Sequence, residues 1–131
     1  MKLISFSFIV FLFTSTLSTS AFATAMFKIT PVNTNVTVAK GDHAFVSYII
    51  ENNIGFATSI KIEPPISPQP TKIANTDCPI NSGFLAFGAS CTLQITTLYA
   101  AQSGTLGSVS VYDASGHIGS KSIEPVQIIV Q

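Results

Sequence analysis

Two cysteines and two histidines are the residues of this chain best suited to redox or metal chemistry. Cys78 and Cys91 lie thirteen positions apart, whereas redox-active dithiols generally occur as Cys-x-x-Cys with a neighbouring group that lowers the thiol pKa. His43 and His117 show no H-x-x-x-H spacing and no nearby cysteine pair, so three zinc ligands would have to come from distant loops. We therefore expect no metal site and no cofactor.

Hydrolytic chemistry has equally little support in the sequence. The segment Gly88-Ala89-Ser90-Cys91-Thr92 resembles a nucleophile elbow, but threonine replaces its second glycine and no strand-to-helix context follows. The acidic residues are scattered singly, which indicates solvated surface charge rather than a carboxylate pair or a calcium loop; they are Asp42, Glu51, Glu63, Asp77, Asp113 and Glu124. The sequence therefore predicts a protein that is not an enzyme.

The length and charge of the chain exclude further classes. It has 131 residues, six lysines, no arginine and six acidic residues, so the formal net charge is zero. This length corresponds to one ordinary domain. Because there is no excess of basic residues to neutralise a phosphate backbone, we expect no nucleic-acid partner.

Residues 1–25 have the organisation of a secretory signal peptide. A short basic start precedes an apolar stretch, residues 3–13, that is too short to cross a bilayer comfortably. The small residues Ala23 and Ala25 predict cleavage after one or the other. An uncleaved N-terminal anchor is the alternative. We expect an exported mature chain, residues 26–131, that has no membrane anchor after cleavage and is periplasmic or extracellular.

The mature chain shows a β pattern throughout, with apolar residues at every second position between clusters of Gly, Pro, Asn and Ser. Residues 44–50 are almost continuously apolar, which predicts a central strand covered on both faces. About seven short strands predict a single antiparallel β-sandwich of immunoglobulin type, with a small barrel as the alternative. The expected strands are an opening strand of two stretches, 27–30 and 35–39, interrupted by Pro31, followed by 44–50, 56–62, 71–74, 91–97, 109–111 and 126–130.

Protein contacts are the remaining kind of activity that the sequence supports. Outward positions are largely Ser, Thr, Asn and Gln, so we expect edge strands without the lysines that usually block pairing. Such an edge can accept a strand from another chain. This predicts an unidentified protein partner bound through an edge strand or loops, and leaves the oligomeric state open. The alternative is that the proline-rich loop, residues 63–70, and the termini cover the edges.

The two cysteines are expected to form a disulfide, because an exported chain folds in an oxidising compartment. A bond between Cys78 and Cys91 would close a short loop and stabilise the fold by about 3 kcal/mol. It would fasten the segment before one strand to the beginning of that strand. We interpret this bond as structural rather than catalytic.

The region of the second cysteine resembles a known kind of module. Residues 85–93, preceded by Cys78, follow the pattern C, spacer, L-x-x-G-x-S-C-x-L, and residues 47–53 are similar to the strand and asparagine turn that open such modules. These features resemble bacterial immunoglobulin-like modules of the choice-of-anchor D type and the wider group of ASPM-SPD-2-Hydin-type domains. After Leu98 the chain keeps the aromatic residue and the glycine of the pattern but lacks its proline.

The resemblance implies a sandwich fold and no catalytic residues. In such modules the glycine and serine, here Gly88 and Ser90, form the turn before the strand, and the second cysteine, Cys91, bonds the first, Cys78. Most of these modules are parts of larger surface proteins, so the resemblance alone leaves the function open.

Three functions are compatible with these features. The first is an exported, non-enzymatic immunoglobulin-like module that makes protein contacts in the envelope or the extracellular space. The second is a pilin-like or adhesin subunit that assembles by strand addition, with residues 26–39 as the donor strand. The third is a secreted effector of unknown activity, whose site would be assembled from loops around His43 or His117.

Overall fold

A computed structural model describes residues 26–100 and 102–131, so the predicted leader and its cleavage positions, Ala23 and Ala25, lie outside the described residues. No helix within these ranges is long and apolar enough to cross a membrane. The regular elements are ten strands: β1 (Phe27–Pro31), β2 (Asn35–Val38), β3 (Phe45–Asn52), β4 (Ile60–Glu63), β5 (Thr71–Thr76), β6 (Ser90–Thr97), β7 (Gly104–Leu106), β8 (Ser110–Asp113), β9 (Gly119–Lys121) and β10 (Val126–Val130).

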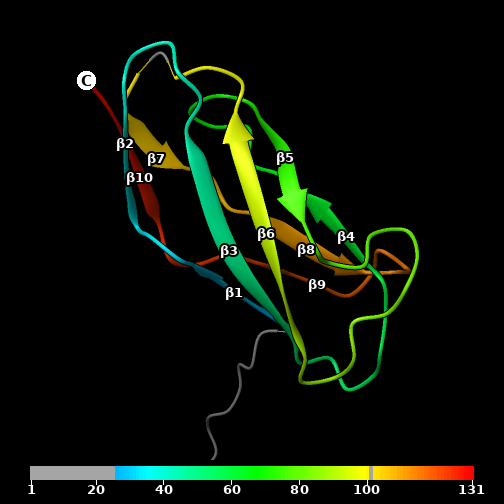
Figure 1. Ribbon diagram of the computed structural model, residues 1–131. Coiled ribbons are helices and arrows are strands. Elements are labelled where there is room, and N and C mark those ends of the chain that lie inside the picture. Colours follow the sequence, from blue (N-terminus) through cyan, green and yellow to red (C-terminus); the bar gives the residue numbers. More distant parts are fainter. Residues whose placement is uncertain (1–25, 101) are drawn as a thin grey trace, which may run out of the picture.

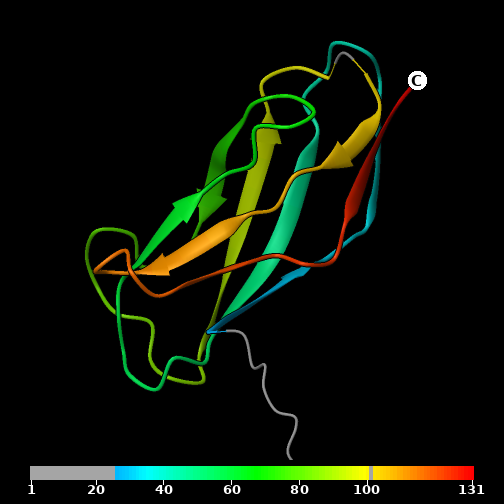
Figure 2. The same cartoon turned by 180° about the vertical axis from the view of Figure 1, so that it is seen from behind.

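The strands form three sheets that are arranged in two layers (Figure 1). One layer is the four-stranded sheet β1-β3-β6-β5. The sheets β2-β10-β7 and β4-β8-β9 together form the other layer. This layer faces the viewer in Figure 2, where the molecule is seen from behind. The chain changes layer between β1 and β2, because β1 pairs with β3 whereas β2 pairs with β10.

The predicted all-β class is confirmed, but the strand pattern is more divided than expected. The pairings are antiparallel except that of β2 with β10, which is parallel. The two stretches of the expected opening strand, 27–30 and 35–39, are separate strands, β1 and β2, since Pro31 cannot donate to a ladder and the chain turns into the second layer. The expected strand 56–62 is shortened to β4, because Thr58 forms only an isolated bridge with Leu85.

The prediction that residues 44–50 are covered on both faces is wrong. The side chains of β3 alternate, so that Val46, Tyr48 and Ile50 are buried in the core. Phe45 and Ile49 point to the other side and are 52% and 43% exposed. Within the described residues, the second layer lies against only the inner face of this sheet, and the apolar composition of β3 did not reveal this (Figure 1).

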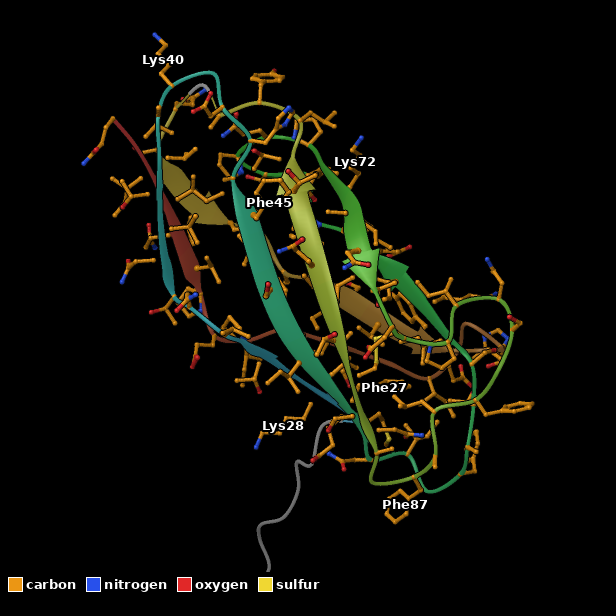
Figure 3. The ribbon with its side chains drawn as sticks, in the orientation of Figure 1. Phe27, Lys28, Lys40, Phe45, Lys72 and Phe87 are labelled. Carbon is orange, nitrogen blue, oxygen red and sulfur yellow. A yellow bond between two sulfur atoms is a disulfide. The ribbon has the colours of Figure 1, made fainter. Side chains whose placement is uncertain are left out.

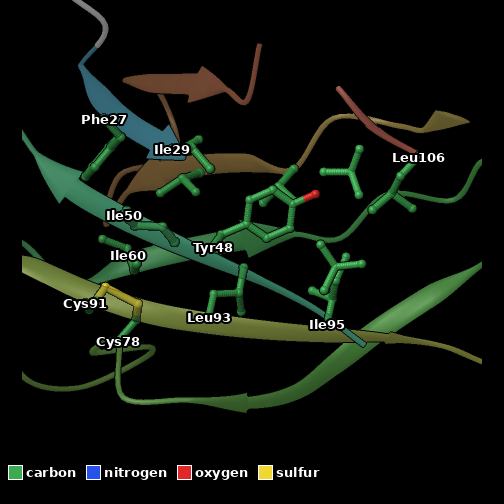
Figure 4. Close-up of a cluster of buried hydrophobic side chains, with 14 of the residues drawn as sticks. Phe27, Ile29, Tyr48, Ile50, Ile60, Cys78, Cys91, Leu93, Ile95 and Leu106 are labelled. Carbon is green, nitrogen blue, oxygen red and sulfur yellow. A yellow bond between two sulfur atoms is a disulfide. The ribbon is translucent and has the colours of Figure 1, made fainter. Parts of the chain in front are cut away.

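The hydrophobic core lies between the layers, with Tyr48 near its centre (Figure 4). Burying a large apolar side chain contributes about 1.5–3 kcal/mol, so these residues supply most of the driving force for folding. The disulfide sulfurs lie at one end of this cluster (Figure 4). The most completely buried large side chains are Tyr48, Phe27, Ile50, Ile60, Leu93, Ile95 and Ile128.

The buried phenol of Tyr48 makes stability depend on alkaline pH. Burial raises the pKa of Tyr48 from 10.0 to about 12. The folded state therefore holds this proton more tightly than the unfolded chain, so the contribution is complete below the unfolded pKa and is lost as pH rises through the folded pKa. We expect Tyr48→Phe to reduce the loss of stability between neutral pH and about pH 11, measured by urea unfolding. An equal loss in both proteins would contradict this assignment.

Candidate functional site

Cys78 and Cys91 form the predicted disulfide, with a Cα–Cα distance of 5.0 Å. Both residues are buried, and the bond joins the segment after β5 to the beginning of β6. The hydroxyl of Thr76 donates to the carbonyl of Thr92 at 2.7 Å, and the N–H of Thr92 donates to Oδ1 of Asp77 at 2.7 Å. A disulfide is consistent with an oxidising, exported compartment.

One group of potential metal ligands occurs among the described residues, at this disulfide. Single ligand atoms of Asp77, Cys78 and Cys91 lie within 4.8 Å of one another. Because the two sulfur atoms are bonded to each other, neither is available as a thiolate. The carboxylate of Asp77 already accepts hydrogen bonds from the N–H and the hydroxyl of Thr92. This group therefore supports the fold and does not provide a metal centre.

The two histidines are exposed and belong to different turns. Nδ1 of His43 lies 2.7 Å from the carbonyl oxygen of Thr97, and the backbone N–H of His117 donates to Oγ of Ser115 at 3.1 Å. The turn before β3 and the turn between β8 and β9 lie at opposite ends of the molecule (Figure 1). The structure thus does not bring the histidines into a common site.

The β3–β4 and β5–β6 loops adjoin at one end of the molecule. Thr58 and Leu85 exchange two backbone hydrogen bonds, of 3.2 and 2.8 Å, and so connect the loops directly. At the end of β3, the N–H of Gly88 donates to the carbonyl of Asn52 at 2.7 Å. These bonds join the two loops to each other and to the end of β3.

The side chain of Asn52 forms hydrogen bonds with the backbone of both loops. Its side-chain Nδ2 donates to the carbonyls of Phe56 and Leu85 at 2.9 and 2.8 Å, and its Oδ1 accepts from the N–H of Ile54 at 2.9 Å. The residue is 0% exposed. Its amide therefore takes the place of water for three loop backbone groups. The sequence indicates only an asparagine turn within residues 47–53 and does not reveal this role of Asn52.

Gly88 lies in the turn that precedes β6, as the family resemblance implies. The N–H of Ala89 donates to the carbonyl of Ala86 at 3.0 Å and closes a β-turn in which Gly88, with φ 84°, is the third residue. A positive φ at this position is typical of a type II turn and favours glycine. Ser90 is the first residue of β6, so it follows the turn instead of forming part of it.

Three phenylalanines on these loops are exposed to solvent, and we call them the phenylalanine surface. Phe56 is 48% exposed, Phe84 78% and Phe87 61%. Figure 3 shows Phe87 at this end of the molecule, directed away from the sheets. The β3–β4 loop contains no charged residue, and the β5–β6 loop contains one, Asp77. Exposed aromatic side chains in surroundings of low charge are typical of protein contact sites.

Alternation of apolar residues along the sequence does not reveal this surface. Phe56 begins the expected strand 56–62, but it lies in a loop before β4 begins. Each of the three phenylalanines is next to a glycine with positive φ: Gly55 at 94°, Gly83 at 80° and Gly88 at 84°. An aromatic residue beside a turn glycine was the signal that could have indicated exposure.

Asp113 is buried, which corrects the expectation that each acidic residue is solvated surface charge. It is 5% exposed, and Oγ of Ser115 donates to its two carboxylate oxygens at 2.8 and 2.9 Å. The N–H groups of Gly116 and Ile118 each donate to Oδ1 at 3.1 Å. Burial alone would raise the pKa of Asp113, but these hydrogen bonds outweigh it and the pKa is lowered. The carboxylate closes the turn between β8 and β9.

The expectation that edge strands lack lysine is also wrong for two of the three sheets. Lys28 lies in β1 and Lys72 in β5, the two edges of the four-stranded sheet. Lys61 lies in β4 and Lys121 in β9, the two edges of the sheet β4-β8-β9. The sequence shows where strands occur, but the position of a strand within a sheet depends on pairings between distant residues.

Comparisons with known proteins add little to this description. No family model matches the chain, and no curated protein matches it. Among solved structures, the secreted serine protease VesC from Vibrio cholerae is similar with a TM-score of 0.46 and 12% sequence identity. The match covers 79% of this chain and 23% of the protease chain. A likeness at this TM-score supports no conclusion about fold or activity.

Proposed function

We propose that residues 26–131 are an exported, non-enzymatic immunoglobulin-like module that binds another protein through the phenylalanine surface. The observation that carries this proposal is the exposure of Phe56, Phe84 and Phe87 on two adjoining loops. The predicted leader and the disulfide support export. The two-layer arrangement of strands and the turn at Gly88 support a module of the choice-of-anchor D type.

The loop geometry favours binding for a physical reason. Burying a phenylalanine side chain against a partner contributes about 1.5–3 kcal/mol, and aromatic side chains often dominate the energy of an interface. The disulfide and the amide of Asn52 hold the loops in place. Less conformational entropy is then lost on binding than with a mobile loop. The low charge of the two loops, in which Asp77 is the one charged residue, also lowers the desolvation cost.

The alternative of donor-strand assembly by residues 26–39 meets an obstacle in this fold. β1 is paired along its length with β3, and β2 is paired along its length with β10. A donor role would require these pairings to break before a strand could be given to a neighbouring subunit. We therefore favour contact through loops that are already exposed.

The test is a triple variant in which Phe56, Phe84 and Phe87 are changed to serine. A control double variant changes Ile66 and Ile123, which are 78% and 92% exposed and lie outside the phenylalanine surface. Photo-crosslinking in cells that produce the protein would identify the partner, and titration with that partner would give the affinity. We expect the triple variant to lose at least about tenfold in affinity and the control to keep it. Equal binding by all three proteins would refute the proposal.

A further inference from the structure

The three sheets have six edge strands within the described residues, and five of them carry a feature that opposes pairing with another chain. Four of these strands, β1, β4, β5 and β9, contain a lysine, which is a common protection of sheet edges. The fifth, β7, is covered by the proline-rich loop. The N–H of Gly107 donates to the carbonyl of Ser67 at 2.8 Å. Pro68 packs so closely on Gly104 that a Cβ atom added to this glycine would lie 3.3 Å from the proline ring. β2 has neither protection.

The free side of β2 presents unpaired backbone groups in a regular pattern. Within the parallel ladder with β10, the N–H of Gln127 donates to the carbonyl of Thr34 at 2.8 Å, and the N–H of Gln131 donates to the carbonyl of Val38 at 3.0 Å. This pattern directs the backbone groups of Val36 and Val38 toward β10, and those of Thr37 away from it. Figures 1 and 2 both show β2 at the outer margin of the molecule.

We propose that β2 pairs with β2 of a second copy of this chain, antiparallel about a two-fold axis at Thr37. In this register Thr37 exchanges two backbone hydrogen bonds with Thr37 of the partner subunit. Val36 lies beside Val38 of the partner subunit, and Asn35 lies beside Ala39 of the partner subunit. The sheet β2-β10-β7 then continues across the axis into the same sheet of the second copy.

Charge selects a second copy as the occupant of this edge. β2 contains no charged residue, so a charged guest strand would find no counter-charge there, whereas a second β2 is neutral. Lys40, the nearest cation beyond β2, falls opposite Thr34 of the partner subunit and meets no like charge in this register. Val36 and Val38 are partly buried against the core, and pairing would cover more of their apolar surface.

A charge-pair experiment at the two-fold axis tests this dimer. Thr37 is exposed, so Thr37→Lys and Thr37→Glu can be made without disturbing the core. Sedimentation velocity over a wide range of concentration should show a monomer–dimer equilibrium for the unaltered mature protein. Each variant alone should have its dimer dissociation constant raised at least about fivefold, because like charges then lie directly opposite. An equimolar mixture of the two variants should form the heterodimer.

Two further variants complete the experiment. Thr37→Pro removes an N–H that points away from β10, so it should abolish dimerisation while the melting temperature stays close to that of the unaltered protein. Ala74→Lys, at an exposed position in β5, should leave dimerisation unchanged. A protein that stays monomeric at all concentrations, or a dimer that none of the Thr37 variants weakens, would overturn the proposal. The triple phenylalanine variant should still dimerise, so this inference and the proposed function can fail separately.

Discussion

Asn52→Ala should lower the free energy of unfolding by about 3 kcal/mol, because it removes the hydrogen-bond partners of three loop backbone groups. The carbonyls of Phe56 and Leu85 would lose their donor, and the N–H of Ile54 would lose its acceptor. The side chain is fully buried, so water does not replace these bonds without rearrangement of the loops. The phenylalanine surface should lose its arrangement together with this stability.

Urea unfolding of three variants measures this effect. Asn53→Ala is the matched control, because the hydrogen bond of Asn53 to Met26 uses its backbone N–H. It should change stability by less than about 0.5 kcal/mol. Asn52→Asp keeps the volume but places a carboxylate oxygen against two carbonyls, so it should be at least as destabilising as Asn52→Ala. If Asn52→Asp were as stable as the unaltered protein, the assigned hydrogen bonds would be wrong.

Removal of the disulfide should have an effect of similar size. The double variant Cys78→Ser, Cys91→Ser should lose about 3 kcal/mol, the value expected when a short loop is no longer closed in the unfolded chain. The hydrogen bonds that join Asp77 and Thr92 remain, so the native strand content should persist at low temperature.

Thermal and urea unfolding with and without reductant give the comparison. Reductant should lower the stability of the unaltered protein to that of the double serine variant, and should leave the variant unchanged. Amide hydrogen exchange should show the largest loss of protection in the β5–β6 loop, which the bond closes. A loss below about 1 kcal/mol would mean that the crosslink contributes little beyond the local hydrogen bonds.

Several elements could be predicted from the sequence because their signals are local. β6 and β10 were expected at 91–97 and 126–130 from the alternation of apolar residues, and they occur at Ser90–Thr97 and Val126–Val130. The turn after β8 follows from the run of turn residues that begins at Asp113. The disulfide could be predicted because the sequence contains only one possible pair, Cys78 and Cys91.

The candidate site could be predicted only in part. Gly88 was placed correctly in a turn, since a glycine before a strand has a local conformational reason. The role of Asn52 was not predictable, because its three partners come from two loops that meet only in the folded protein. Phe56 illustrates the same difficulty, because alternation suggests a buried face even where no neighbouring strand is present to bury it.

The sequence by itself therefore determined the all-β class, the main strands and the disulfide pair, because alternation, turn residues and cysteine number act over short distances along the chain. Only the tertiary structure decided that the chain changes layer after Pro31, that Phe45 lies outside the core and that β2 is an edge strand without lysine. These properties depend on which distant strands become neighbours. A strand has an exposed face or a free edge only in relation to the strands packed beside it.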